Sequence, residues 1–288
     1  MCRRLDRICR KRRESLNSEN LVGQRTIYVR CYHSMAFLKI IACEIAVREL
    51  YYVAARSRNL VDLEFLTQGH HDVPAKGRAE IQERINAVPP KKYDAIALGY
   101  GLCSNILVGL TTPHTPLIIP RAHDCITLFL GSKERYQTCF SERPGTYYYT
   151  SGWLECARRR GDQGMTWGGA SLPASAKLNL QAAYEKWVQK YGEEQANYLR
   201  EEMGRWTDSY THGTLIDFDF LKGLNLPAEV RQVCDEKGWR YDEVPGDLKL
   251  LQHLVDADWP AQDFLRVEPG RKVVATFDEQ VIGVEPET

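Results

Sequence analysis

The chain has 288 residues, no net charge at pH 7 and the apolar fraction of an ordinary globular protein, which is enough for one large α/β domain or two packed lobes. It has no run of about 18 apolar residues, which argues against a membrane-spanning helix. The charge is uneven: residues 1–34 carry nine Lys or Arg and three Asp or Glu, so the remainder is acidic, which argues against nucleic-acid binding.

Residues 1–34 form a basic leader. They lack the apolar core of a secretory signal, and their charge is typical of a transit peptide or a nucleic-acid-binding tail. Alternatively, Met35 is the true start, because a strand pattern begins directly after it. We expect a disordered leader and leave its cysteines out of the site. Nine cysteines without an export signal predict a reducing cytoplasm, where clustered cysteines indicate metal or catalysis more often than disulfides.

The first half alternates strand and helix patterns. Short connections in a β-α-β-α-β order predict a parallel sheet with right-handed crossovers. The predicted strands are 37–42, 60–66, 93–98 and 117–119, and the predicted helices are 44–55, 76–88 and one or two short ones within 126–140.

The second half begins with residues 145–153, which are aromatic and β-prone. Residues 158–176 are rich in Gly, Ser and charge and predict a mobile loop or lid. The alternation of strand and helix then resumes, with strands at 213–218, 239–244, 262–267 and 272–277 and helices at 178–191, 193–206, 227–237 and 248–255.

These patterns predict an α/β fold with a Rossmann-like parallel sheet, either as one unit or as two α/β lobes facing a cleft. The expected parts are a leader at 1–34, an α/β unit at 35–157, a lid or helical insertion at 158–211 and a second α/β unit at 212–288.

Three cysteines follow three predicted strands: Cys43, Cys103 and Cys125. Parallel strand ends on one edge are neighbours about 4.8 Å apart, so these thiols can converge in one crevice, with sulfurs roughly 4 to 7 Å from each other. Three thiolates can hold Zn²⁺ with one exchangeable position, or an iron–sulfur cluster with one open iron. The alternative is that they are buried structural thiols, since free Cys is among the most buried residue types.

Polar residues at the same strand ends are the other candidates. Glu44, beside Cys43, and His123 are candidates for proton transfer or for supporting a ligand, and Arg121 for holding an anionic group. Each also has a purely structural explanation. Glu44 could be a first-turn carboxylate that interacts with the helix dipole, and the other two could lie in a surface turn.

The turn after the third strand supplies Gly99, Gly101 and Asn105, which we predict to approach a bound cofactor through the backbone. It lacks the G-x-G-x-x-G and Walker patterns, so a nucleotide is disfavoured. Residues Tyr147 to Tyr149 and Trp153 could line a small-molecule pocket, although an aromatic strand is more often core. His70, His71 and Asp72 are expected in a polar loop.

The segments ACE at the first cysteine, YGLC, PRAHDC, GTYYYTSGW and the late PGD together resemble an uncharacterised family, domain of unknown function 1638 (DUF1638), over roughly Phe37 to Pro269. The three cysteines lie in these segments. The resemblance implies a setting in corrinoid-dependent methyl transfer or one-carbon metabolism.

The leading hypothesis is a cytoplasmic metal- or iron–sulfur-dependent enzyme or accessory protein that acts on a small molecule. A corrinoid methyltransferase is a possible partner. The alternative is a non-catalytic carrier of a metal or cofactor that serves a methyltransferase. An enzyme should have an enclosed pocket, whereas a carrier should have an exposed site beside an apolar docking patch.

Overall fold

The computed structural model describes residues 35–68, 74–160, 184–185, 187–189, 191–198, 210–276 and 278–286. The chain divides into two units, residues 1–34 and residues 35–288, and the structure described below belongs to the second. The predictions for the leader, for His70 to Asp72 and for most of the expected lid lie outside the described residues.

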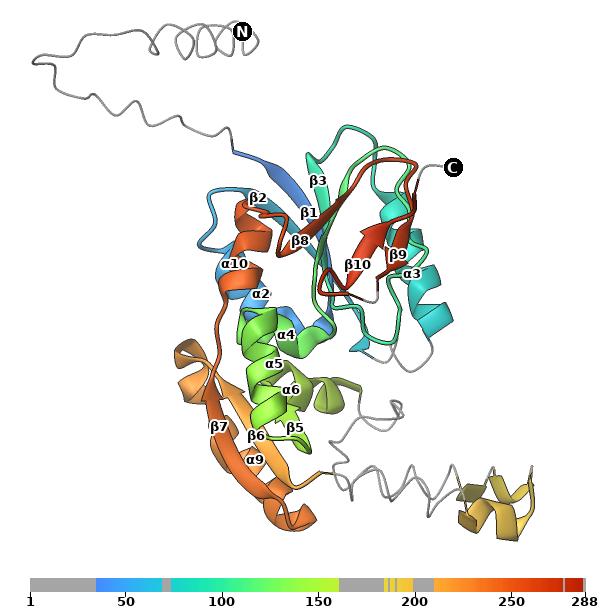
Figure 1. Ribbon diagram of the computed structural model, residues 1–288. Helices are drawn as coiled ribbons and strands as arrows, with labels where there is room; N and C mark the ends of the chain where they lie inside the picture. The colour runs from blue at the N-terminus through green and yellow to red at the C-terminus, as the bar shows by residue number, and fades with distance from the viewer. Residues whose placement is uncertain are drawn as a thin grey trace, which may run out of the picture. The chain divides into compact units, whose positions relative to one another are not determined.

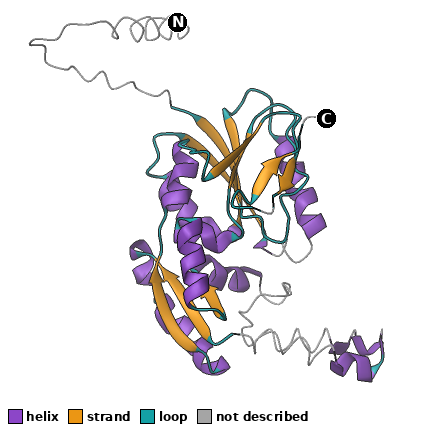
Figure 2. Ribbon diagram, viewed as in Figure 1, coloured by secondary structure: helices purple, strands orange, loops and turns teal. Residues whose placement is uncertain are grey.

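The central sheet has five strands in the order β2-β1-β3-β4-β8 (Figures 1 and 2). Its members are β1 (Phe37–Cys43), β2 (Leu60–Leu66), β3 (Ala95–Gly99), β4 (Leu117–Pro120) and β8 (Phe264–Val267). The first four are parallel, and β8 runs antiparallel to β4. Every residue of β3 and β4 is buried, as expected for strands covered on both faces. The predicted α/β fold with a mostly parallel central sheet is confirmed.

Helices cover both faces of this sheet. The 3-10 turn η1 (Glu44–Ala46) and helix α2 (Val47–Ala54) follow β1, and α3 (Pro74–Ala87) precedes β3. Figure 1 shows α2 and α10 (Lys249–Asp256) on one side of the sheet and α3 on the other. Four apolar residues of α10 are buried, which gives this helix one face for the sheet.

The strand order reverses between β1 and β3. From β1 the chain moves outward to β2, then returns to place β3 on the opposite side of β1. In open α/β sheets, the crevice beyond the carboxyl ends of strands at such a reversal is where ligands bind. The fold therefore provides a site where β1 and β3 end.

A second sheet contains β5 (Thr146–Tyr149), β6 (His212–Asp217) and β7 (Arg240–Pro245), all parallel, in that order. The 3-10 segment η5 (Asp219–Leu224) and helix α9 (Leu226–Lys237) connect β6 to β7. Its strands come from both sides of the expected 158–211 insertion.

The strands that follow β7 do not join the second sheet, although residues 212–288 were expected to form one α/β unit. β8 pairs with β4 in the central sheet, and β9 (Val273–Ala275) forms a hairpin with β10 (Ile282–Val284). Three of the four residues of β8 are buried, so this apolar strand covers the edge that β4 would otherwise expose. Strand pairing thus crosses the expected boundaries at 157 and 212.

The segment between the two sheets is helical. The short helices α4 (Cys125–Leu130) and α5 (Lys133–Glu142) match the prediction for this region. The β-prone run 145–153 is strand only to Tyr149, because α6 (Ser151–Arg160) begins two residues later. The Thr150 hydroxyl accepts a hydrogen bond from the backbone N–H of Trp153 at 3.2 Å, which caps this helix. No helix within the described ranges has the length and apolarity to cross a membrane.

Helix α6 packs directly on the start of the first helix. A side chain on Gly152 would place its Cβ 1.7 Å from the carbonyl oxygen of Ile45, so only glycine permits this approach. Beside this contact, Arg48 on α2 and Glu155 on α6 form an ion pair at 2.6 Å. The contact joins η1, at the carboxyl end of β1, to the start of α6, where Trp153 lies.

Candidate thiol site

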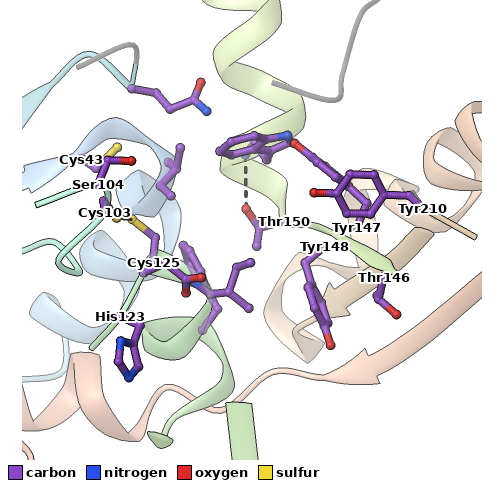
Figure 3. A pocket seen from close by; sticks show the side chains of 16 residues that line it. Cys43, Cys103, Ser104, His123, Cys125, Thr146, Tyr147, Tyr148, Thr150 and Tyr210 are labelled. Atoms are coloured by element: carbon purple, nitrogen blue, oxygen red, sulfur yellow. Dashed lines mark hydrogen bonds between the residues drawn. The ribbon is translucent and has the colours of Figure 1, made fainter. Parts of the chain in front are cut away.

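Three cysteines from the carboxyl edge of the central sheet border one cavity of about 460 Å³. Cys43 is the last residue of β1, Cys103 follows β3 by four residues, and Cys125 is the first residue of α4, beyond β4. Figure 3 shows the three side chains grouped on one side of this cavity. The reversal of strand order lies between the first two, as expected for a site in an open α/β sheet.

The sulfurs are close together. Cys103 Sγ lies 3.4 Å from Cys125 Sγ, slightly closer than the expected range, and the Cys43 thiol also contacts Cys125. Cys43 is buried, and the other two are half-buried. The predicted convergence of the three side chains is present in the structure. Their role as ligands stays a prediction.

Backbone contacts hold Cys103 against the loop that leads to Cys125. The backbone N–H of Leu102 donates to Ala122 O at 2.8 Å, and that of Cys103 donates to His123 O at 2.9 Å. A Cβ on Gly101 would lie 2.4 Å from the backbone carbon of Asp124, so the loops approach this closely only because residue 101 is glycine.

The turn that presents Cys103 has an unusual backbone. Cys103, Ser104 and Asn105 have φ angles of 36°, 56° and 63°, three consecutive non-glycine residues in the left-handed region. Each such residue costs roughly 1–2 kcal/mol. Strained backbone of this kind is concentrated at functional sites, where the surrounding structure maintains it.

The surroundings of Cys43 and Cys103 favour the thiol form over the thiolate form. Contact with the Cys125 thiol, followed by burial, raises the pKa of both Cys43 and Cys103 well above the ordinary thiol value. The backbone N–H of Ile45 acts in the opposite direction on the Cys43 pKa but does not outweigh them.

Tyr100, between the two glycines of the turn, is a residue that the sequence analysis did not select. Its side chain is 3% exposed, and its hydroxyl has no hydrogen-bond partner among the described residues. Burial, and then the nearby Cys43, Cys125 and Cys103, raise the pKa of this phenol. The hydroxyl therefore lies near the sulfurs as an uncommitted donor.

The three predicted polar residues have different roles. Glu44 does not line the cavity; its Oε1 accepts the backbone N–H of Gln68 at 2.9 Å and ties η1 to the end of β2. His123 lines the cavity but is exposed, and Figure 3 shows its ring pointing away from the sulfurs. Proton transfer by these two residues stays a prediction.

Arg121 contacts main-chain carbonyls, and its predicted role in holding an anionic group stays a prediction. Its Nε donates to Ala261 O at 2.9 Å, and its Nη1 donates to Gln280 O at 3.0 Å and to Ile282 O. The guanidinium thus binds main-chain carbonyls around the β9–β10 hairpin and does not border the cavity.

The predicted cofactor-binding backbone also lies off the cavity. Gly99 packs against Ala42 and Leu50, where a Cβ would lie 2.6 Å from Ala42 Cβ. Gly101 is needed for loop contact, and Asn105 is exposed, with its carbonyl accepting a bond from Arg78 at 3.3 Å. Close backbone packing accounts for both glycines without a cofactor.

Asp124 is a further acidic residue at the site. Its carboxylate caps α4, accepting bonds from Ile126 N at 3.0 Å and Thr127 N at 3.3 Å, and accepts the Tyr136 hydroxyl at 2.9 Å. Burial, and then the nearby Cys125, raise the pKa of Asp124. It therefore orients α4 and its first residue, Cys125.

The opposite side of the cavity is aromatic, as Figure 3 shows for its labelled tyrosines. Its side chains are Tyr147, Tyr148, Trp153 and Tyr210. The sequence pattern suggested Tyr147 to Tyr149 and Trp153 as lining residues. Tyr149 is instead fully buried and does not border the cavity. Tyr210 was missed because it is distant in sequence and only the β5–β6 pairing brings it near.

A single ion could fit the sulfur spacing after small adjustments. Two thiolates sharing a tetrahedral zinc, each about 2.3 Å from it, lie about 3.8 Å apart, against the 3.4 Å between Cys103 and Cys125. Across the described part of the chain, no group of three or more His, Cys, Asp or Glu side chains is already arranged to hold a metal ion. Binding would thus require the thiol rotamers to change.

Comparison with known proteins places the chain in a family. Residues 65–255 match the family described as "Protein of unknown function (DUF1638)". The chain belongs to this family. The matched range includes Cys103 and Cys125, whereas Cys43 precedes it. No curated protein and no solved structure matches the chain.

Proposed function

We propose that this DUF1638 protein binds a soft metal ion through Cys43, Cys103 and Cys125 and acts on a small molecule held in the adjoining cavity. The observation that carries the proposal is the convergence of three thiols at the sheet's reversal point, with two sulfurs 3.4 Å apart. Thiolates select soft or borderline ions such as Zn²⁺ over Mg²⁺ or Ca²⁺.

The spacing favours one ion over an iron–sulfur cluster. In a four-iron cluster each thiolate binds a different iron atom, so the sulfurs lie farther apart than two that share one ion. The 3.4 Å separation is near the separation expected around a single zinc. Three protein ligands leave a fourth position for a ligand, and a metal with such a position can activate a bound thiol or water.

The cavity favours an enzyme over a carrier. A cavity of about 460 Å³ lies within the range of small-molecule sites, roughly 300–1,000 Å³. The thiols border this cavity, and Cys43 is buried. A carrier would be expected to present its ligands on an open surface to a partner. The cytoplasmic location and a corrinoid methyltransferase partner remain proposals that rest on cysteine usage and on the family resemblance.

Metal content measured after purification without oxygen tests the proposal. We expect about one equivalent of zinc or a similar ion in the native protein and its loss in Cys103→Ala. Cys139→Ala is the matched control, because Cys139 is half-buried on α5 and does not border the cavity. Equal metal in both variants, or no metal uptake by the reduced native protein, would contradict the proposal.

A second candidate function is dithiol redox chemistry, which the Cys103–Cys125 separation also supports. Two thiols would form one disulfide and release two protons, with two electrons passing to a disulfide-containing substrate that is reduced to two thiols. Thiol counting distinguishes the candidates. Reversible loss of two thiols upon exposure to oxidised glutathione, without metal uptake by the reduced protein, would favour this reaction over the metal site.

A further inference from the structure

The cavity beside the cysteines has two chemically different walls. One presents the sulfurs and the half-buried carboxylate of Asp124, and the other presents aromatic rings. The ring faces are not parallel: the centroid of Tyr147 lies 6.2 Å from that of Trp153 at 57°, and 5.3 Å from that of Tyr210 at 81°. Rings at such angles form adjoining walls rather than a flat stack.

The charges on the cavity wall disfavour an anion. Among the described residues that line the cavity there is no Lys or Arg, and Asp124 is the one Asp or Glu. A buried anionic ligand would find no lysine or arginine to pair with there, and burying an unpaired charge costs free energy. A cation would instead meet electron-rich ring faces, sulfur and a carboxylate, all of which attract positive charge.

The aromatic wall favours an alkylated cation over one with several N–H donors. An ammonium group has three donors to satisfy. The Asp124 carboxylate already accepts bonds from Ile126, Thr127 and Tyr136, and the Thr150 hydroxyl already accepts one from the backbone of Trp153. An alkylated cation makes no such demand, and its methyl groups suit the aromatic wall.

We infer that the cavity binds a small organic cation with a methylated ammonium head, held against the aromatic wall formed by Tyr147, Tyr148, Trp153 and Tyr210. The inference deepens the proposed function by naming a ligand class and rests on it for the use of this cavity. Binding of the cation to the rings does not itself require a metal on the thiols, so the two proposals can fail separately.

Isothermal titration of the native protein with three ligands of matched shape tests the inference. The probes are choline, its neutral carbon analogue 3,3-dimethyl-1-butanol, and the anion 3,3-dimethylbutanoate. Choline should bind roughly tenfold more tightly than the neutral analogue, because contacts between a cation and ring faces depend on charge. The anion should bind most weakly. Equal affinities, tighter binding of the anion, or no binding of choline would overturn the inference.

Variants locate the effect. Trp153→Leu should reduce the preference for choline over the neutral analogue, whereas Trp259→Leu, outside the cavity, should retain it. Native protein treated with a metal chelator should also keep the preference, which separates this result from metal binding. Loss of the preference in Trp259→Leu as well as in Trp153→Leu would count against binding at the aromatic wall. The comparison of ligands on the native protein remains decisive if a variant fails to fold.

Discussion

Outside the thiol site, Glu49 is an ionisable side chain in a fully buried environment. It lies on α2 with no exposed surface, and its Oε1 accepts the Ser151 hydroxyl at 2.9 Å. Its Oε2 has no hydrogen-bond partner in the described part of the chain. Burial raises the pKa of Glu49 to about 7, so near neutral pH this carboxyl is partly protonated.

Stability should therefore depend on pH through Glu49. Between its unfolded pKa of about 4.5 and its folded pKa of about 7, the folded state binds more protons than the unfolded state. The free energy of unfolding should fall by about 3 kcal/mol as the pH rises through this window. Glu49→Gln should remove this decline and be the more stable protein at pH 8.

Urea unfolding at pH 5 and pH 8 measures this effect. Glu83→Gln is the matched control, because Glu83 is exposed on α3 and should leave the pH dependence of the native protein unchanged. An identical decline in the native protein and in Glu49→Gln would show that another group carries it.

At the scale of elements, the junction of α6 and η1 brings the aromatic wall to the cysteines. The backbone of Gly152 lies against Ile45, and Trp153 is the next residue. This junction also contains the Arg48–Glu155 ion pair, half-exposed on the arginine side and therefore of modest value. Close backbone contact is thus the main reason why the two walls meet at this separation.

Gly152→Ala should break this contact. The added Cβ would lie 1.7 Å from Ile45 O, so α6 must move away, at a cost of about 3 kcal/mol or more of unfolding free energy. Gly223→Ala is the control, because nothing lies within 4 Å of its added Cβ, and it should change stability by about 0.5 kcal/mol or less. Similar denaturation midpoints for the two variants would contradict the account of this junction.

The elements themselves were largely predictable from sequence. Alternating apolar runs and helical patterns indicated β1 to β4 with α2 and α3, because each signal is local. The pairing of β8 with β4 was not predicted, since nothing within Phe264–Val267 specifies which sheet edge it covers. The early start of α6 depends on a threonine cap inside an aromatic run, which propensity alone reads as strand.

At the scale of the whole molecule, the site's location was predictable but its chemistry only in part. The ends of parallel strands must meet on one edge, and this placed the three cysteines together. The contacts of Arg121 were not predicted, because its acceptors are main-chain carbonyls more than a hundred residues away. The position of the aromatic wall opposite the sulfurs depends on the contact between α6 and η1. The only sign of this contact in the sequence is Gly152, so it could not be predicted.

X-ray absorption at the edge of the bound metal tests most directly whether the three thiols act as one metal site. In protein loaded with one equivalent of zinc, we expect three sulfur neighbours at about 2.3 Å, with one lighter atom completing the shell. Each of Cys43→Ala, Cys103→Ala and Cys125→Ala should lower the sulfur count, whereas Cys139→Ala should leave it at three. A shell of nitrogen and oxygen with one sulfur or none would contradict the shared thiol site.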